Sequence, residues 1–291
     1  MKKTLERLYR FSNSWTGTII IVLMIIFFLA QAFVIPSGSM KNTLHEGDYL
    51  LVKKFTYGVP IPHLPWVEIP LLPDIFGNGH LKEGSRPLRG EIVVFRFPHA
   101  PKIHYVKRNV AVGGDGVMGR GDSLYLRPHE GDTYIRQNFP KEQIVTINGE
   151  LWVKDPYLHK HPGVRYDYRA REQGILPPET SNFGPLRVPE DQFFMVGDNR
   201  DHSNDSRFWG SVPYKYIVGK PWFIYFSWDS RSYEEVANRG IFLTDYEAIE
   251  AVCGDLDPFS SACEAKWERQ RFKIRWDRIG QGMRGLERLL R

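Results

Sequence analysis

Cysteine is scarce in this chain of 291 residues, which contains only Cys253 and Cys263. No histidine or third cysteine lies near them at zinc-ligand spacing, so we expect no metal and no cofactor. Two such cysteines form a local disulfide in an oxidising compartment and stay as thiols in a reducing one. The sequence leaves these two alternatives open.

Signatures of nucleic-acid binding are also missing. The formal net charge of +5 at pH 7 suits an anionic partner, but there is no zinc-finger spacing, no RRM-type aromatic motif and no long Lys/Arg tract. We therefore expect no nucleic acid among the partners and favour membrane lipid as the acidic partner. The hydrophobic fraction of 42% and charged fraction of 25% are those of a globular protein.

Long apolar runs are absent except for one, TGTIIIVLMIIFFLAQAFV at residues 16–34. At a rise of about 1.5 Å per residue, roughly 20 apolar residues cross a hydrocarbon core of about 30 Å. The basic character of segment 1–15 marks the cytoplasmic side. We therefore expect a cytoplasmic N-terminus at 1–15, a single transmembrane anchor at 16–34 and export of all that follows. The basic residues are Lys2, Lys3, Arg7 and Arg10.

A cleavable secretory signal is the alternative to an anchor. Ala30-Gln31-Ala32 resembles the small-x-small site that ends such signals, and it follows a basic region and an apolar region. Under this alternative the apolar run is removed. Both alternatives export the rest of the chain.

Several segments rich in β-branched and aromatic residues follow the apolar run and predict strands. We expect a mainly β fold: an N-terminal transmembrane helix followed by an antiparallel β catalytic domain with an inserted β subdomain. The first part of the catalytic domain is expected at 35–115 and the second at 191–228. The expected strands are 48–58, 91–97, 102–112, 192–196 and 221–228.

The remaining segments read as insertions and a tail. Residues 116–190 mix short strand-like pieces with charged loops, and the Asn148-Gly149 pair suits a hairpin turn. We expect the inserted β subdomain there, and a second insertion at 229–271 that contains the cysteine pair and a short helix over 246–252. Residues 272–291 are expected to form a final strand and a basic C-terminal tail.

The segment between the first two expected strands, 59–90, interleaves prolines with leucine, isoleucine, tryptophan and phenylalanine. This composition disfavours both a helix and a central strand and predicts an extended apolar loop. Two interpretations remain open. The apolar side chains either pack over a sheet or insert shallowly into the membrane surface beside the anchor.

No G-x-S-x-G motif is present, and none of the nine histidines falls in a recognisable catalytic motif. His202, beside Ser203, is the one histidine in a suggestive segment. A lysine replaces histidine as a base when burial lowers its pKa. Lys107, in the apolar stretch HYVKRNV, is a candidate for this role. A solvated lysine on an edge strand is the ordinary alternative.

The segment MVGDNRDHSNDSRFWGSVP, residues 195–213, concentrates aspartates and arginines between two apolar stretches. Alternating Asp and Arg side chains satisfy one another through bidentate pairs and make a polar turn rigid. A solvated loop or a calcium loop is the alternative. The arginines and the missing glutamate at the twelfth position argue against an EF-hand loop.

Four motifs stand in order along the chain: PSGSM (36–40), GEIVVFRFP (90–98), YVKRNVAVGGD (105–115) and GDNRDHSNDSRFWGSVP (197–213). Behind an N-terminal apolar run, they closely resemble bacterial type I signal peptidase (leader peptidase), a membrane-anchored serine/lysine protease. The resemblance implies a serine endopeptidase that removes N-terminal signal peptides from exported preproteins after Ala-x-Ala sites. It implies a place in the bacterial inner membrane near the export machinery, with a periplasmic or extracellular catalytic domain.

The resemblance also implies the roles of individual residues. Ser39 matches the nucleophile and Lys107 the general base. The Ser37 hydroxyl and the Ser39 backbone N–H match the oxyanion hole, and Ser203 matches the serine that orients the lysine. The remaining matches are a structural ion pair, Asp205 and Arg207, and a substrate pocket for small side chains, Met40, Tyr105 and Val106.

Asn42 departs from the family pattern, which usually has proline at this position, and suggests a looser turn after Ser39. There are two rival functions, and each fails to explain one feature of the sequence. A repressor-type Ser/Lys autoprotease would be cytosolic, which the apolar run disfavours. A non-enzymatic scaffold in the exported compartment would not need a lysine of lowered pKa at position 107.

Overall fold

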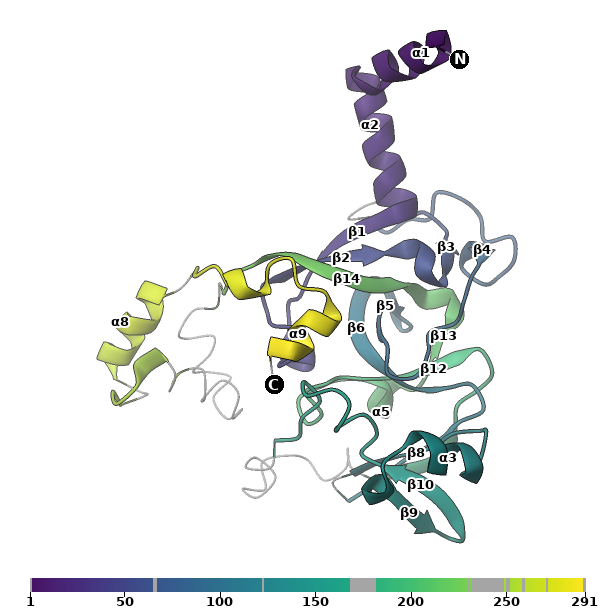
Figure 1. Ribbon diagram of the computed structural model, residues 1–291, viewed down its shortest axis with the longest axis vertical. Helices are drawn as coiled ribbons and strands as arrows, with labels where there is room; N and C mark the ends of the chain where they lie inside the picture. Colours follow the sequence, from purple (N-terminus) through teal and green to yellow (C-terminus); the bar gives the residue numbers. More distant parts are fainter. Residues whose placement is uncertain are drawn as a thin grey trace.

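Two antiparallel sheets form the body of the protein in the computed structural model (Figure 1). The structure describes residues 2–64, 67–121, 123–167, 182–229, 231, 249, 252–257, 260–270 and 272–289. Within these residues, a seven-stranded sheet has the order β1-β2-β14-β5-β6-β12-β13, and a five-stranded sheet has the order β11-β7-β8-β10-β9. The expectation of a mainly β, antiparallel protein is confirmed.

The larger sheet unites segments from both ends of the chain. Its strands are β1 (Ala30–Val34), β2 (Asp48–Lys53), β14 (Ile217–Ser227), β5 (Ile92–Phe97), β6 (Ala100–Val112), β12 (Gln192–Val196) and β13 (Val212–Pro213). In β2, alternate residues are buried, because successive side chains of a strand point to opposite faces of the sheet. In β5, Val93 and Phe95 face one apolar cluster and Ile92 and Val94 face another, so apolar cores cover both faces of the sheet.

The smaller sheet lies at the far end of the body from the N-terminal helices (Figure 1). It consists of β7 (Gly116–Arg120), β8 (Ser123–Arg127), β9 (Ile144–Ile147), β10 (Glu150–Lys154) and β11 (Phe183–Arg187), with α3 (Asp132–Asn138) beside it. The Asn148-Gly149 pair joins β9 to β10 with positive φ at both residues, as a primed hairpin turn requires. The strands of the smaller sheet all lie within residues 116–190, the segment in which the inserted β subdomain is expected.

The N-terminal apolar run divides into a helix and a strand. Helix α1 (Lys2–Ser12) precedes α2 (Trp15–Met24), which continues as π-helix η1 (Ile25–Leu29). Residues 30–34, expected as the end of the anchor, instead form β1 and pair with β2. The expected boundary at residue 34 is wrong, because pairing with β2 satisfies the backbone of these residues outside a helix. Among the described residues, no helix has the length and apolar character needed to cross a membrane.

The C-terminal part also differs from expectation. The expected final strand is wrong, because the chain there forms the 3₁₀ turn η7 (Trp276–Arg278) and helix α9 (Met283–Leu289). Leu286 of α9 is buried in the same apolar cluster as β2 and β5. The cysteines of the second insertion form the disulfide Cys253–Cys263, and Cys263 belongs to helix α8 (Ser261–Gln270). Most of the helix expected over 246–252 lies outside the described residues.

Candidate active site

The turn after β1 carries the predicted nucleophile. The pairing of β1 with β2 extends to Ile35, whose N–H donates to the Asp48 carbonyl at 2.9 Å. The chain then forms the 3₁₀ turn η2 (Gly38–Met40), which contains Ser39. Met40 and Leu44 are fully buried in the apolar core, and their packing holds the turn against the sheet. Ser39 itself is 9% exposed.

Strand β6 brings Lys107 to this turn. Lys107 lies opposite Val93 in the β5–β6 pair and is 4% exposed. Its Nζ donates a hydrogen bond to Ser39 Oγ at 2.5 Å. Burial lowers the pKa of Lys107 to about 8, although the Asp205 and Asp198 carboxylates oppose that shift. The structure therefore places the predicted serine and lysine in contact, with an amine that loses its proton more readily than an ordinary lysine.

Ser37 lies beside the same hydroxyl. Its Oγ is 3.4 Å from Ser39 Oγ. Among the described residues, Ser39 Oγ is hydrogen-bonded by Lys107 and Ser37 and by no histidine. His202 instead contacts Asp167, with 2.9 Å between His202 Nε2 and Asp167 Oδ2. The alternative of a Ser-His-Asp arrangement at Ser39 is therefore not supported.

Ser203 lies in the site without its implied contact. It is 6% exposed, and within the described residues its hydroxyl makes no hydrogen bond of standard geometry. A side chain at Gly197 would collide with Ser203 Oγ and with the Ser39 carbonyl, so Ser203 packs against the nucleophile turn. The implied hydrogen bond from Ser203 to Lys107 is not formed in this structure.

The predicted ion pair between Asp205 and Arg207 is present. Arg207 Nε and Nη2 donate to the two carboxylate oxygens of Asp205 at 2.8 and 2.9 Å. Asp205 also accepts a bond from the Gly197 N–H at 2.9 Å. The arginine lowers the pKa of the buried Asp205 carboxyl, so the carboxylate stays charged near Lys107. This pair makes the polar turn rigid, as the alternating charges predict.

A second group of contacts was not predicted from the sequence. The buried Arg108 donates two hydrogen bonds of 2.7 Å to Asp198, and Thr43 Oγ1 donates to the same carboxylate at 2.6 Å. Asn199 Nδ2 donates to the Gly38 carbonyl at 3.0 Å, and its N–H donates to the Ser39 carbonyl at 3.2 Å. These bonds join the polar turn to the serine turn and to β6.

The three residues of the implied substrate pocket divide between two faces of β6. Met40 and Val106 share one apolar cluster, and Val106 is partly buried in it. Tyr105 lies on the opposite face, where its ring centroid is 5.2 Å from Lys107 Nζ. The structure therefore places Met40 and Val106 together and Tyr105 beside the lysine.

Asn42 is suited to its turn. Its φ of 79° lies in the left-handed region, which asparagine adopts more readily than most residues. Proline cannot take this value, because its ring fixes φ near about −65°. The Met40 carbonyl accepts bonds from the Thr43 and Leu44 N–H groups at 3.0 and 2.8 Å. The turn is hydrogen-bonded on both sides of Asn42, and the expectation that it is looser than a proline-containing turn stays a prediction.

One carboxylate-histidine group in the described residues has ligand atoms close enough for a metal: Asp115, His129 and Glu130, all within 4.8 Å of one another. The guanidinium of Arg89 lies among them. It donates to Asp115 at 2.6 Å and to Glu130 at 2.7 Å and lies 3.1 Å from His129 Nδ1. These groups are satisfied by a cation of the chain itself.

Known proteins of one family resemble this chain. The family profile described as signal peptidase, peptidase S26, matches residues 8–228. A signal peptidase I of Helicobacter pylori (strain ATCC 700392 / 26695) is 42% identical over 309 residues, covering 99% of this chain and 98% of that protein. A signal peptidase I of Pseudomonas aeruginosa is 32% identical over 252 residues, covering 79% and 77%. A solved signal peptidase I from Enterococcus faecalis V583 is 25% identical, covers 47% of this chain and 97% of that chain, and has a TM-score of 0.26.

Proposed function

Because the chain belongs to the signal peptidase family, peptidase S26, we propose that it cleaves signal peptides from exported preproteins with a dyad of Ser39 and Lys107. The chain is a hydrolase of the serine endopeptidase class. The observation that carries the proposed dyad is the 2.5 Å hydrogen bond between the buried Lys107 Nζ and Ser39 Oγ.

The proposed reaction begins with the neutral amine of Lys107. It accepts the proton of Ser39 Oγ while that oxygen attacks the scissile carbonyl carbon. The resulting ammonium is stabilised by the Asp205 and Asp198 carboxylates, which favour the charged form of this lysine. It then gives its proton to the leaving amine, which departs as the acyl-enzyme forms. Water, deprotonated by Lys107, releases the product acid and Ser39.

The proposed oxyanion hole combines the Ser37 hydroxyl with the Ser39 backbone N–H. Both donors belong to the same turn as the nucleophile, which Asn199 holds through the carbonyls of Gly38 and Ser39. Donors fixed before the reaction stabilise the developing charge without reorganising during it. The 3.4 Å between the two serine hydroxyls supports this role, because a carbonyl attacked by Ser39 would lie within reach of both.

We propose that the substrate binds as an added strand. Among the described strands, β12 pairs with β6 only from Arg108 to Val112, so the stretch before Lys107 has a strand neighbour on the β5 side alone. An extended peptide along this stretch would bring its scissile bond to Ser39. We propose that this peptide carries small side chains of the Ala-x-Ala type before the scissile bond, as the family resemblance implies; Met40 is fully buried in this structure, and Val106 is partly buried in the same apolar cluster.

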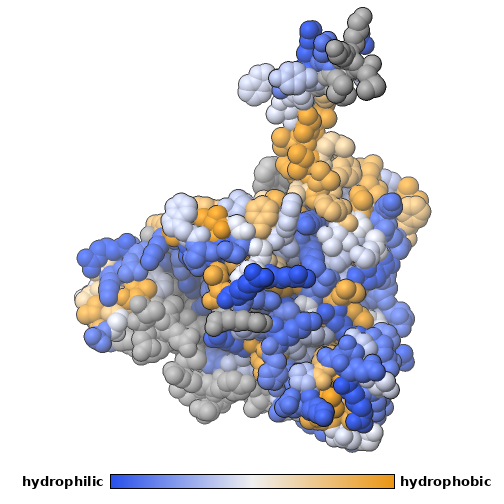
Figure 2. All heavy atoms as spheres, in the orientation of Figure 1, coloured by the Kyte–Doolittle hydropathy of each residue, from blue (hydrophilic) through white to orange (hydrophobic). Residues whose placement is uncertain are grey.

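The apolar loop supports a membrane location. Ile61 is buried, but most of the loop's other described large apolar side chains are exposed, with Ile75 and Phe76 at 81% and 70%. Figure 2 shows apolar surface that continues from α2 onto the adjoining part of the body, where Figure 1 places β3 (Gly58–Pro60) and β4 (His80–Glu83). Such a patch suits contact with lipid. We propose that this face rests on the bacterial inner membrane, with residues 16–29 anchored in it and the active site outside, near the export machinery.

Peptide cleavage tests the proposed function. The full chain in detergent is given a peptide with Ala-x-Ala before the scissile bond, and products are identified by mass spectrometry. We expect cleavage after the second alanine. Turnover is expected to fall by at least about 10³-fold in Ser39→Ala and in Lys107→Ala. The double variant is expected to be no worse than either single variant, because the two residues act as one unit. His202→Ala is the control. Substantial turnover by Lys107→Ala, or an equal loss in His202→Ala, would contradict the dyad.

A further inference from the structure

Glu46 lies against the turn that carries the nucleophile. It is 9% exposed, and a methyl group added at Gly38 would lie 3.8 Å from Glu46 Oε1. Gly38 separates Ser37 from Ser39, the two residues of the proposed oxyanion hole. A buried carboxylate therefore lies beside the place where negative charge would develop during the reaction.

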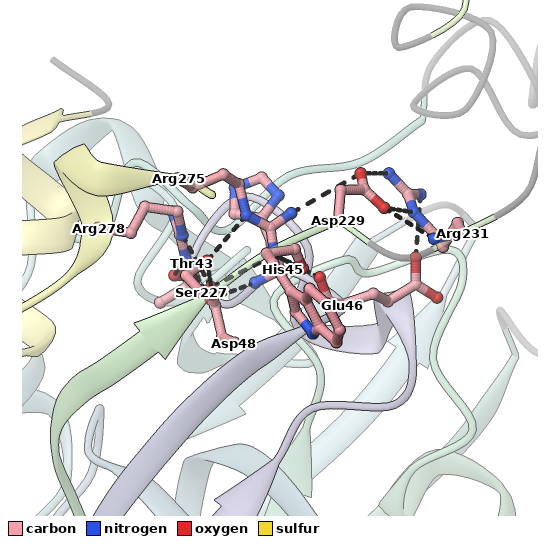
Figure 3. Close-up of polar contacts among 10 residues, drawn as sticks. Thr43, His45, Glu46, Asp48, Ser227, Asp229, Arg231, Arg275 and Arg278 are labelled. Carbon is pink, nitrogen blue, oxygen red and sulfur yellow. Dashed lines mark hydrogen bonds and ion pairs between the residues drawn. The ribbon is translucent and has the colours of Figure 1, made fainter. Parts of the chain in front are cut away.

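Arg231 forms an ion pair with this carboxylate, beside which the buried Lys41 side chain also lies. Arg231 Nη1 donates to Glu46 Oε2 at 3.0 Å, while Nε and Nη2 donate to the two carboxylate oxygens of Asp229 at 2.9 and 2.6 Å (Figure 3). The side chains of Arg231 and Glu46 are 16% and 9% exposed. Because water screens such a pair weakly, the charge of each partner acts more strongly on its neighbours than it would at the surface.

The backbone around Glu46 is fixed as well. Arg275 Nη2 donates to the Glu46 carbonyl at 2.5 Å (Figure 3). The next residue, Gly47, donates to the Ile35 carbonyl at 2.9 Å and accepts from the Trp228 N–H at 3.1 Å. A side chain at Gly47 would collide with the Trp228 carbonyl. The position of the Glu46 carboxylate is thus set by both the backbone and Arg231.

Contacts within the second insertion hold Arg231 in place. The Arg231 carbonyl accepts a hydrogen bond of 3.1 Å from Trp267 Nε1 of α8. Trp267 is buried in one apolar cluster with the disulfide-bonded Cys253 and Cys263. The second insertion has no recognisable family motif. It is nevertheless connected to the turn that carries Ser39, because Trp267 binds the Arg231 carbonyl and the Arg231 side chain binds Glu46.

We infer that Arg231 is a positioning residue for the proposed oxyanion hole. It holds the Glu46 carboxylate in place beside Gly38 and cancels the negative charge that this carboxylate would direct at the developing oxyanion. The inference rests on the proposed function and goes beyond it, since it gives the second insertion a part in transition-state stabilisation. The residue acts through Glu46 and the turn, without touching the substrate.

The test uses the full chain in detergent and the Ala-x-Ala peptide. Arg231→Ala is expected to lower kcat by about ten- to a hundredfold, the effect of a charge a few ångströms away at an intermediate dielectric, with KM within about twofold. Adding Glu46→Gln to Arg231→Ala is expected to recover most of that kcat, because the opposing charge is gone. Arg127→Ala is the matched control, since Arg127 of β8 forms an ion pair with Asp132 of α3, away from the serine turn.

Each outcome has one meaning. An unchanged kcat in Arg231→Ala overturns the inference, and so does a loss that Glu46→Gln does not relieve, which indicates a role in folding alone. If Arg231→Ala does not fold, Arg231→Lys and Arg231→Gln decide: a kcat retained by lysine and lost with glutamine supports the inference, and equal loss contradicts it. A wild-type chain that fails to cleave the peptide, or a Ser39→Ala variant that cleaves it, instead contradicts the proposed function.

Discussion

Burial determines the chemistry of Lys107. Tyr105, Val106 and Lys107 follow one another on β6, so the lysine points toward the serine turn while Val106 packs into the core on the other face. Removing the ammonium from water lowers its pKa, and the Asp205 and Asp198 carboxylates limit the fall to about 8. Burial thus gives Lys107 a lower pKa than a lysine in water has, which is what the proposed role of general base requires.

Ser37→Ala removes one proposed oxyanion donor. Because a lost side-chain donor typically costs about 10²- to 10³-fold in turnover, kcat is expected to fall by that factor while KM changes little. Steady-state kinetics with the Ala-x-Ala peptide measures both constants, and Ser37→Thr, which keeps a hydroxyl, serves as the control with partial activity. An unchanged kcat in Ser37→Ala would show that the hydroxyl does not contact the oxyanion.

Asn42→Pro tests the turn after the nucleophile. Proline cannot adopt the φ of 79° found at this position, so we expect it to destabilise the protein by more than about 1 kcal/mol. Asn42→Gly, which accepts this φ, is expected to stay within about 1 kcal/mol of wild type. Urea unfolding gives both values. Equal stability of the proline and glycine variants would mean that the turn does not hold this conformation.

At the scale of elements, the sequence predicts best where a motif is contiguous. The serine turn, the Lys107 strand and the hairpin at Asn148 were each predictable from neighbouring residues. The end of the apolar run was not, because hydropathy does not distinguish a helix from strand β1, which forms only by pairing with β2. The final strand expected within 272–291 does not form either: residues 276–278 make the turn η7, and burial of Leu286 against the sheet favours helix α9.

The loop around Phe76 is expected to contact lipid. Both native cysteines are in the disulfide, so Phe76→Cys offers a single thiol for a nitroxide label in proteoliposomes. We expect the label to collide often with oxygen and rarely with a nickel chelate, because it lies in the apolar layer. The control is Leu186→Cys, because Leu186 is 49% exposed on β11 of the smaller sheet. A label there should collide often with the nickel chelate and less often with oxygen. Equal access of nickel to both labels would contradict the membrane contact.

At the scale of the whole molecule, distant segments converge on the serine turn. Arg278, close to the C-terminus, donates to both carboxylate oxygens of Asp48 at 3.0 and 2.5 Å. Glu287 of α9 lies 3.4 Å from Arg108, which in turn contacts Asp198. The sequence could not predict these contacts, because each joins residues far apart in the chain and depends on the order of strands in the sheet. The sequence could identify Ser39 and Lys107 as candidate site residues. Only the folded structure shows that their side chains are in contact.

The pH dependence of kcat/KM tests the central claim, that a neutral Lys107 is the base for Ser39. A lysine of pKa about 8 is mostly protonated below pH 8 and gains base character as pH rises, so kcat/KM of the free enzyme is expected to increase through an ascending limb near pH 8. Unperturbed histidine would place the limb near about 6.5 and unperturbed lysine near about 10.4. A limb near about 6.5 that disappears in His202→Ala would contradict the account.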